Sequence, residues 1–151
     1  MIKIITVGSI KEKYLKDAIE EYKKRLSKYT NIEIIEVKDE GLVEPQKAIK
    51  LEEEKILKHV SEKDYIITLE IEGKQFSSEE FAYKLDRIQL ESSNITFIIG
   101  GSYGLSENIK NKSKLHLSFS KMTFPHQLFR VLLLEQIYRA YKINNNESYH
   151  K

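Results

Sequence analysis

Short apolar runs alternate along the chain with longer stretches in which apolar residues recur every three or four positions. The runs "IKIITV", "IEIIEV", "YIITLEI", "ITFII" and "KLHLSFS" begin at residues 2, 32, 65, 95 and 114 and predict five strands. The stretches between them predict helices over residues 11–29, 45–60 and 77–88, a short helix after residue 104 and a long one after residue 125. This alternation predicts an α/β fold with a mainly parallel five-stranded sheet and helices on both faces, in a single domain over residues 1–151.

Local signals mark where some of these elements begin and end. Pro45 is expected in the first turn of a helix, and Ser77 with Glu80 forms the capping-box pattern that opens the next one. The "EGK" at residues 72–74 is expected to turn the chain at the end of the third strand.

Composition narrows the class of protein. The chain is 40% hydrophobic and 32% charged, as soluble globular proteins are. No apolar run approaches the ~20 residues that span a bilayer, and a signal-peptide pattern is absent, so we expect a cytoplasmic protein without membrane contact. The absence of Cys excludes thiolate catalysis, and the four His residues are too dispersed for a metal cluster, so no metal is expected. A net charge of +2 means that any nucleic-acid partner must meet a local basic surface.

Candidate chemistry gathers where three predicted strands end. Ligands of open parallel sheets bind beyond the carboxyl ends of the strands, which here are residues 69–72, 100–104 and 119–124. "IIGGSYG" has the spacing GGxxG rather than GxGxxG, so it is either a ligand loop or only a tight turn. "SFSKMTFPHQLFR" is either an ordinary strand-to-helix joint or a stiff, apolar loop without glycine that holds a flat aromatic base.

The last helix and the residues after it are unusual in opposite ways. "LFRVLLLEQIYRAYKI" is apolar on more than one face, so it is either a central helix or, as we favour, a subunit interface in a twofold homodimer. Leu133, at the centre of this helix, is expected in that interface, and in the core if the helix is central. The following "NNNESYHK" is polar, so we expect a frayed terminus, and we expect its last four residues, "SYHK", to contribute nothing to folding. Its last three residues nevertheless suit base stacking and contacts to a proton or a phosphate.

Several segments together resemble one known family. "IITLEIEGK", "FIIGGSYGL", "LSFSKMTFPHQLFRVLLLEQIYRAYKI" and the final "YHK" are similar to the ribosomal large-subunit pseudouridine N3-methyltransferases, which belong to the SPOUT class. The resemblance covers essentially the whole chain and implies a C-terminal trefoil knot, a homodimer, S-adenosyl-L-methionine as cofactor, and 23S rRNA within assembled ribosomes as substrate. By position, it implies that the cofactor contacts Leu69, Gly100, Phe119, Ser120, Lys121, Met122, Thr123 and Phe124.

The resemblance also suggests roles in catalysis. His150 is a candidate base for the N3–H proton, because its unperturbed pKa lies near neutrality. Tyr149 could stack on the uracil ring, and Arg139 could hold a phosphate or a carbonyl that gains negative charge. These residues could complete the site of their own subunit or that of the partner. Two alternatives stay open: a SPOUT methyltransferase acting on another RNA such as tRNA, or a non-enzymatic nucleotide-binding dimer.

Overall fold

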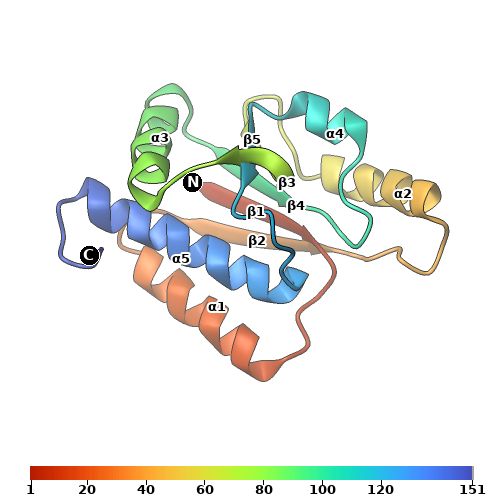
Figure 1. The fold of residues 1–151 in the computed structure, drawn as a ribbon, viewed down its shortest axis with the longest axis horizontal. Helices are drawn as coiled ribbons and strands as arrows, with labels where there is room; N and C mark the ends of the chain where they lie inside the picture. The colour runs from red at the N-terminus through yellow and green to blue at the C-terminus, as the bar shows by residue number, and fades with distance from the viewer. Residues whose placement is uncertain (151) are drawn as a thin grey trace.

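A computed structural model describes residues 1–150, and its five strands form one parallel sheet (Figure 1). The strands are β1 (Ile2–Val7), β2 (Ile32–Val37), β3 (Tyr65–Gln75), β4 (Ile95–Ile99) and β5 (Leu115–Ser118). They lie in the order β2-β1-β4-β3-β5, and every pair is parallel. The helices are α1 (Lys13–Leu26), α2 (Pro45–Leu57), α3 (Ser78–Glu91), α4 (Glu107–Lys112) and α5 (His126–Asn144). The predicted α/β class is therefore confirmed.

The strand sequences explain the order of the sheet. All five residues of β4 are buried, and β1 is apolar on both faces, as expected of strands that helices cover on each side. By contrast, β2 carries two exposed Glu residues, Glu33 and Glu36, and lies at an edge of the sheet, where only its Val37 is fully buried.

Helices cover both faces of the sheet, as predicted (Figure 1). One face packs against α1, α3 and α5, and the other against α2 and α4. The prediction that Leu133 lies in a subunit interface is wrong, since this side chain is fully buried in its own chain's core. Much of the apolar surface of α5 is used in this way, because the helix packs against both α1 and α3 as well as the sheet.

The third strand does not end where the sequence suggested. It continues through "EGK" to Gln75, with a register shift opposite β5 between Leu69 and Lys74. Gly73 allows this path: a Cβ there would lie 2.7 Å from the carbonyl oxygen of His116. The expected turn is therefore a bulged strand. The signals for helix starts were right, because Pro45 opens α2 and the Ser77–Glu80 capping box opens α3.

The segment after α5 packs against the rest of the chain, so the expectation of a frayed terminus is wrong. Glu147 accepts hydrogen bonds from Tyr29 Oη at 2.6 Å and from Lys142 Nζ at 3.1 Å. These bonds lower the pKa of the Glu147 carboxyl to about 2. Tyr149 packs edge-on against Tyr138, with ring centroids 5.0 Å apart. Lys151, which belongs to the same motif, lies outside the described residues.

Two further expectations concern the whole chain. Within residues 1–150, no helix combines the length and apolar character needed to cross a membrane. The trefoil knot stays a prediction, because strand order alone does not determine how the loops pass one another.

Candidate functional site

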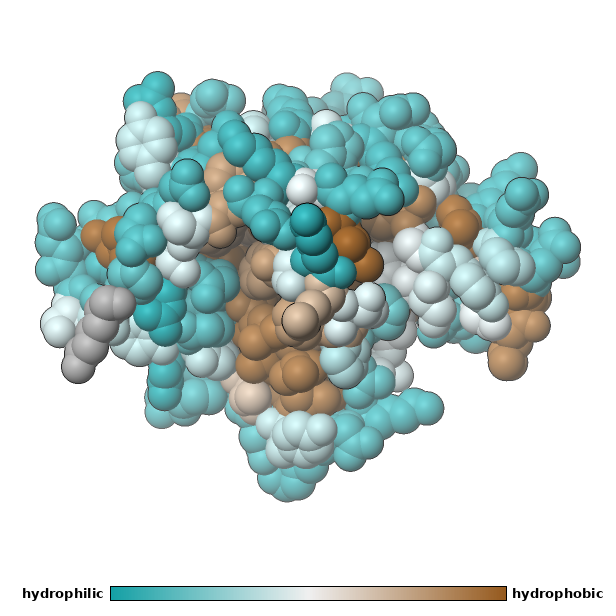
Figure 2. Space-filling model, in the orientation of Figure 1, coloured by the Kyte–Doolittle hydropathy of each residue, from teal (hydrophilic) through white to brown (hydrophobic). Residues whose placement is uncertain are grey.

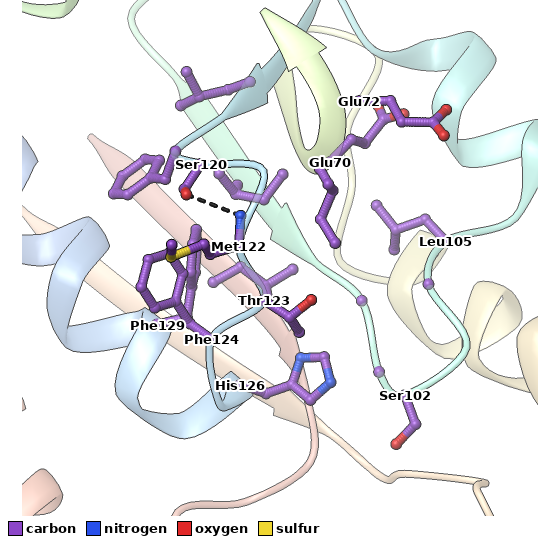
Figure 3. Close-up of a pocket in the computed structure, with 18 of the residues that line it drawn as sticks. Glu70, Glu72, Ser102, Leu105, Ser120, Met122, Thr123, Phe124, His126 and Phe129 are labelled. Carbon is purple, nitrogen blue, oxygen red and sulfur yellow. Dashed lines mark hydrogen bonds between the residues drawn. The ribbon is translucent and has the colours of Figure 1, made fainter. Parts of the chain in front are cut away.

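A cavity of about 490 Å³ lies at the carboxyl ends of β4 and β5, beside the bulged part of β3. Three segments enclose it: residues 69–72 of β3, the glycine-rich turn after β4, and the loop between β5 and α5 (Figure 3). Its volume is in the range of sites that bury a small organic ligand. In Figure 3, Thr123 and His126 face Ser102 across the opening. The cavity therefore occupies the edge of the sheet where the sequence placed a ligand.

The glycine-rich turn is shaped by close backbone contacts. A Cβ at Gly100 would lie 2.8 Å from the carbonyl carbon of Gly104 and 3.0 Å from Leu105 Cδ2. Gly104 has φ of +83°, a conformation that side chains disfavour, and its N–H donates to the carbonyl of Gly101 at 3.0 Å. The interpretation of "GGSYG" as a tight turn is confirmed, and the turn also lines the cavity, while its contact with a ligand stays a prediction.

The loop before α5 is held by its own aromatic residues. The rings of Phe119 and Phe124 lie 4.9 Å and 6.0 Å from that of Phe129, which belongs to the first turns of α5. Ser120 Oγ accepts a hydrogen bond from the Met122 N–H at 2.9 Å (Figure 3). The aromatic contacts therefore anchor the loop through Phe119 and Phe124, while Lys121, Met122 and Thr123 between them are exposed.

A buried arginine fixes the position of this wall. Arg130 is 2% exposed and donates to the Glu36 carboxylate at 2.6 Å and to the carbonyl of Gly8 at 2.8 Å. Burial lowers its pKa, and the hydrogen bond to Glu36 opposes that shift. Since β1 and β2 end at these partners, Arg130 ties the start of α5 to the sheet and so holds Phe129 at the cavity.

Acidic residues line the side of the cavity formed by β3. Glu70 and Glu72 both contribute to the lining. Glu70 accepts a hydrogen bond from Thr68 Oγ1 at 2.6 Å and also pairs with His116 Nδ1. The sequence suggested no partner for His116, because its partner comes from a strand 46 residues away.

Seven of the eight residues expected to contact the cofactor line the cavity. They are Leu69, Gly100, Phe119, Ser120, Met122, Thr123 and Phe124. Lys121 is exposed on the same loop and is not part of the described lining, so its role stays a prediction. Sequence reasoning missed Phe129 and His126, although both follow directly from the loop whose shape they help to define.

The three expected catalytic residues come together in a second place. Arg139 Nη1 lies 3.1 Å from His150 Nδ1, and its guanidinium carbon is 4.7 Å from the ring centre of Tyr149. Two further carboxylates join them: Glu135 bonds Arg139 at 2.7 Å and accepts from Tyr149 Oη at 2.9 Å, and Glu79 lies 2.6 Å from His150 Nε2. Burial, followed by the bond to Glu135, raises the pKa of Tyr149. We call these five residues the tail cluster.

Of the two carboxylates in the tail cluster, the sequence indicates Glu135 but not Glu79. Glu135 precedes Arg139 by four residues on a helix, the spacing of a helical ion pair, so it could have been found. Glu79 is 71 residues from His150, and nothing in the sequence indicates that contact.

The tail cluster and the cavity lie at different parts of α5. His126 lines the cavity at the start of the helix, and Arg139 follows thirteen residues later, about 20 Å along the helix axis. Within residues 1–150, the lining of the cavity includes no member of the tail cluster and no residue of α3. One chain alone therefore does not bring the tail cluster to its own cavity. No group of three or more potential metal-binding side chains occurs in the described part of the chain.

Comparison with known proteins gives consistent matches over the full length. Residues 1–150 match the family model described as "Predicted SPOUT methyltransferase". The chain is 56% identical to a putative ribosomal RNA large subunit methyltransferase H of Methanococcus maripaludis, over 99% of each chain. It is 53% identical to the ribosomal RNA large subunit methyltransferase H of Caldicellulosiruptor saccharolyticus, over 100% of each. A solved structure of a probable methylase family protein from Haemophilus influenzae shares the fold, with a TM-score of 0.61, 15% identity, and coverage of 99% of this chain and 70% of that one.

Proposed function

The chain belongs to the SPOUT methyltransferase family, and from this premise we propose that it methylates N3 of a pseudouridine in 23S rRNA, with S-adenosylmethionine as methyl donor. The observation that carries the proposal is the cavity enclosed by the carboxyl ends of β4 and β5 and by the bulged part of β3. The names of the relatives support a large-subunit rRNA substrate. The substrate would be the assembled ribosome in the cytoplasm.

The residues of the cavity fit the proposed cofactor. Its volume of about 490 Å³ suits a nucleoside with an amino-acid chain, and the Phe119 and Phe129 rings offer apolar surface to a flat base. At Gly100 a Cβ would overlap the backbone of Gly104, so glycine lets the turn fold back tightly at the wall of the cavity. Glu70 and Glu72 supply negative charge at a site for a sulfonium cation. When bound, S-adenosylmethionine supplies an already activated methyl group, so the protein mainly has to bind the cofactor and align it with the acceptor base.

A second copy of the chain would bring the tail cluster to the cavity. The space-filling view shows an apolar patch at the centre of the face that carries α5, framed by hydrophilic residues (Figure 2). Leu128 is 38% exposed and Met122 77% exposed, while Val131 and Leu132 are half-buried. If two copies pack antiparallel through this patch, the end of one α5 lies beside the start of the other. The tail cluster of one subunit then completes the partner's cavity.

The chain's own residues would act on the acceptor base. Arg139 is positively charged and held by Glu135, so it can stabilise the carbonyl oxygen on which charge accumulates as the imide loses its proton. His150 is placed beside it and can accept the N3–H proton. Tyr149 presents a ring that packs against Tyr138, so it can support a stacked base without large reorganisation.

The test combines binding and product analysis. Isothermal titration calorimetry should show binding of S-adenosylmethionine and no comparable binding of ATP. Incubation with ribosomes from a strain that lacks the enzyme should then add one methyl group to a pseudouridine of 23S rRNA, read by mass spectrometry of nuclease fragments. Methylation of tRNA instead would replace the proposed substrate, and preference for ATP would refute the methyltransferase assignment.

A further inference from the structure

The hydrogen bonds around His150 define which of its ring nitrogens carries the proton. An arginine guanidinium can only donate, so the contact of 3.1 Å from Arg139 Nη1 requires a lone pair on His150 Nδ1. The proton of the neutral ring therefore lies on Nε2, which is 2.6 Å from Glu79 Oε1. The arrangement is one carboxylate, one imidazole and one guanidinium in a row, contributed by α3, the segment after α5, and α5 itself.

Glu79 is well suited to remain the acceptor in this row. It lies in the first turn of α3, where its own backbone N–H and the bond to His150 lower the pKa of its carboxyl. A negative side chain is also favoured at the start of a helix by the helix dipole. The charged groups that face His150 are Glu79 from α3 and Arg139 from α5, with Glu135 behind Arg139. Its ring is only partly exposed, with 26% of the side-chain surface accessible.

We propose that Glu79 is a positioning residue for methyl transfer, which fixes His150 in the Nε2–H tautomer and so pairs the Nδ1 acceptor with the Arg139 donor. This inference rests on the proposed function. It goes beyond it, because it assigns a role to a residue on α3 that neither the cavity nor the sequence indicated.

The Arg139 donor and the His150 Nδ1 acceptor match the hydrogen-bonding edge of an imide. Arg139 and His150 satisfy each other in the free protein. The imide edge of a pseudouridine offers a carbonyl oxygen and the N3–H side by side, so it can replace their mutual bond by two: Arg139 to the carbonyl, and N3–H to His150 Nδ1. Neither polar group is left without a partner in either state, which avoids the cost of an unpaired donor or acceptor.

The same geometry specifies the proton transfer. The N3–H bond breaks and an Nδ1–H bond forms on His150. The electron pair stays on the imide, shared between N3 and its two carbonyl oxygens, one of which faces Arg139. The imidazolium that results carries both ring protons, and the Glu79 carboxylate beside Nε2, which is itself exposed to solvent, stabilises its charge. The proton later leaves His150 to solvent.

The first experiment needs neither cofactor nor RNA. Nitrogen-15 NMR of the histidine rings in the full-length protein, above pH 8, distinguishes the two neutral tautomers, and the His150→Gln spectrum assigns the His150 signals. We expect the full Nε2–H pattern in the wild type and a partly averaged pattern in Glu79→Ala. Glu79→Gln should keep the pattern, because its amide oxygen still accepts from Nε2–H. A wild-type Nδ1–H pattern, or no change in Glu79→Ala, would overturn the proposal.

The second experiment measures methylation of ribosomes. Glu79→Ala should lower kcat by about 10- to 100-fold, the usual effect of losing a group that orients another, while KM for ribosomes and the Kd of S-adenosylmethionine stay unchanged. The kcat of Glu79→Gln should lie between those of the wild type and Glu79→Ala, because glutamine keeps the hydrogen bond to His150 but has no charge. Asp86→Asn and Asp86→Ala are matched controls, because Asp86 is an exposed carboxylate on the same helix, and they should match the wild type.

The outcomes separate this inference from the proposed function. Wild-type kcat in a folded Glu79→Ala dimer would reject the positioning role even if the enzyme methylates ribosomes as proposed. Failure of the wild type to methylate ribosomes would reject the proposed function, while the NMR result would still decide whether Glu79 fixes the tautomer. Thermal unfolding of each variant ensures that a lower kcat does not reflect loss of the fold.

Discussion

Gly100→Ala tests the link between the glycine-rich turn and cofactor binding. The added methyl group would lie 2.8 Å from the carbonyl carbon of Gly104 and 2.9 Å from its oxygen, against 3.4 Å for an ordinary van der Waals contact. Backbone atoms cannot rotate away as the end of a flexible side chain can, so the turn itself has to move outward. Forced overlaps of this kind typically cost about 1–3 kcal/mol.

This cost should appear in cofactor affinity. In the free protein the turn relieves the overlap by shifting, and binding must bring it back to its original position. Since ~1.4 kcal/mol is a factor of ten, the Kd of S-adenosylmethionine should rise about 10- to 100-fold, as measured by calorimetry. Gly41→Ala is the matched control: its Cβ would lie 3.0 Å from Asp39 Oδ1, a side-chain atom that can move, outside the cavity lining. Wild-type affinity in a folded Gly100→Ala protein would refute the reasoning.

Three further predictions concern assembly and pH. Leu128→Glu should yield a folded monomer by light scattering. Leu90→Glu is the control, because Leu90 is a more exposed leucine on α3, and this variant should remain a homodimer. A dimeric Leu128→Glu protein would contradict the proposed interface. Burial raises the pKa of Glu52, so wild-type stability falls as pH rises above the ordinary Glu value, and Glu52→Gln should raise the melting temperature at pH 7–8 but not near pH 4. Glu147 has the opposite sign: its hydrogen bonds stabilise the fold above pH 4.5 and are lost toward pH 2, so Glu147→Gln should lower the melting temperature at pH 7 and have little effect at pH 2. If Glu147→Gln lowers the melting temperature equally at pH 7 and pH 2, the charge of Glu147 does not contribute to stability.

The sequence alone determined the class of fold and most of the cavity. Apolar runs of strand length with helical periods between them are sufficient for an α/β sheet, because each pattern is local and reflects which face is buried. The cavity followed from the same reasoning, since parallel strands end at one edge and the loops after β4 and β5 meet there, beside residues 69–72 of β3. The loop from Phe119 to Phe124 was recognisable because its apolar residues and lack of glycine do not suit a solvated joint.

Local patterns failed where a distant segment decides the conformation. "EGK" reads as a turn, but pairing with β5 extends the strand through it, and Gly73 permits the close approach of His116. The sequence pattern placed Leu133 in an interface, because periodicity shows that a side chain is buried but not whether its own chain or a partner covers it.

The tail cluster shows the limit most clearly. Sequence provided Arg139, Tyr149 and His150 as candidates, but it made the segment that carries two of them look frayed. Only the tertiary structure brought Tyr29 to Glu147 and Glu79 to His150, over separations of 118 and 71 residues. A polar segment has no apolar pattern to indicate where it docks, and its position depends on hydrogen-bond partners that the fold supplies from elsewhere in the chain. The tautomer of His150, and with it the role proposed for Glu79, is therefore a property of the folded protein that no local pattern contains.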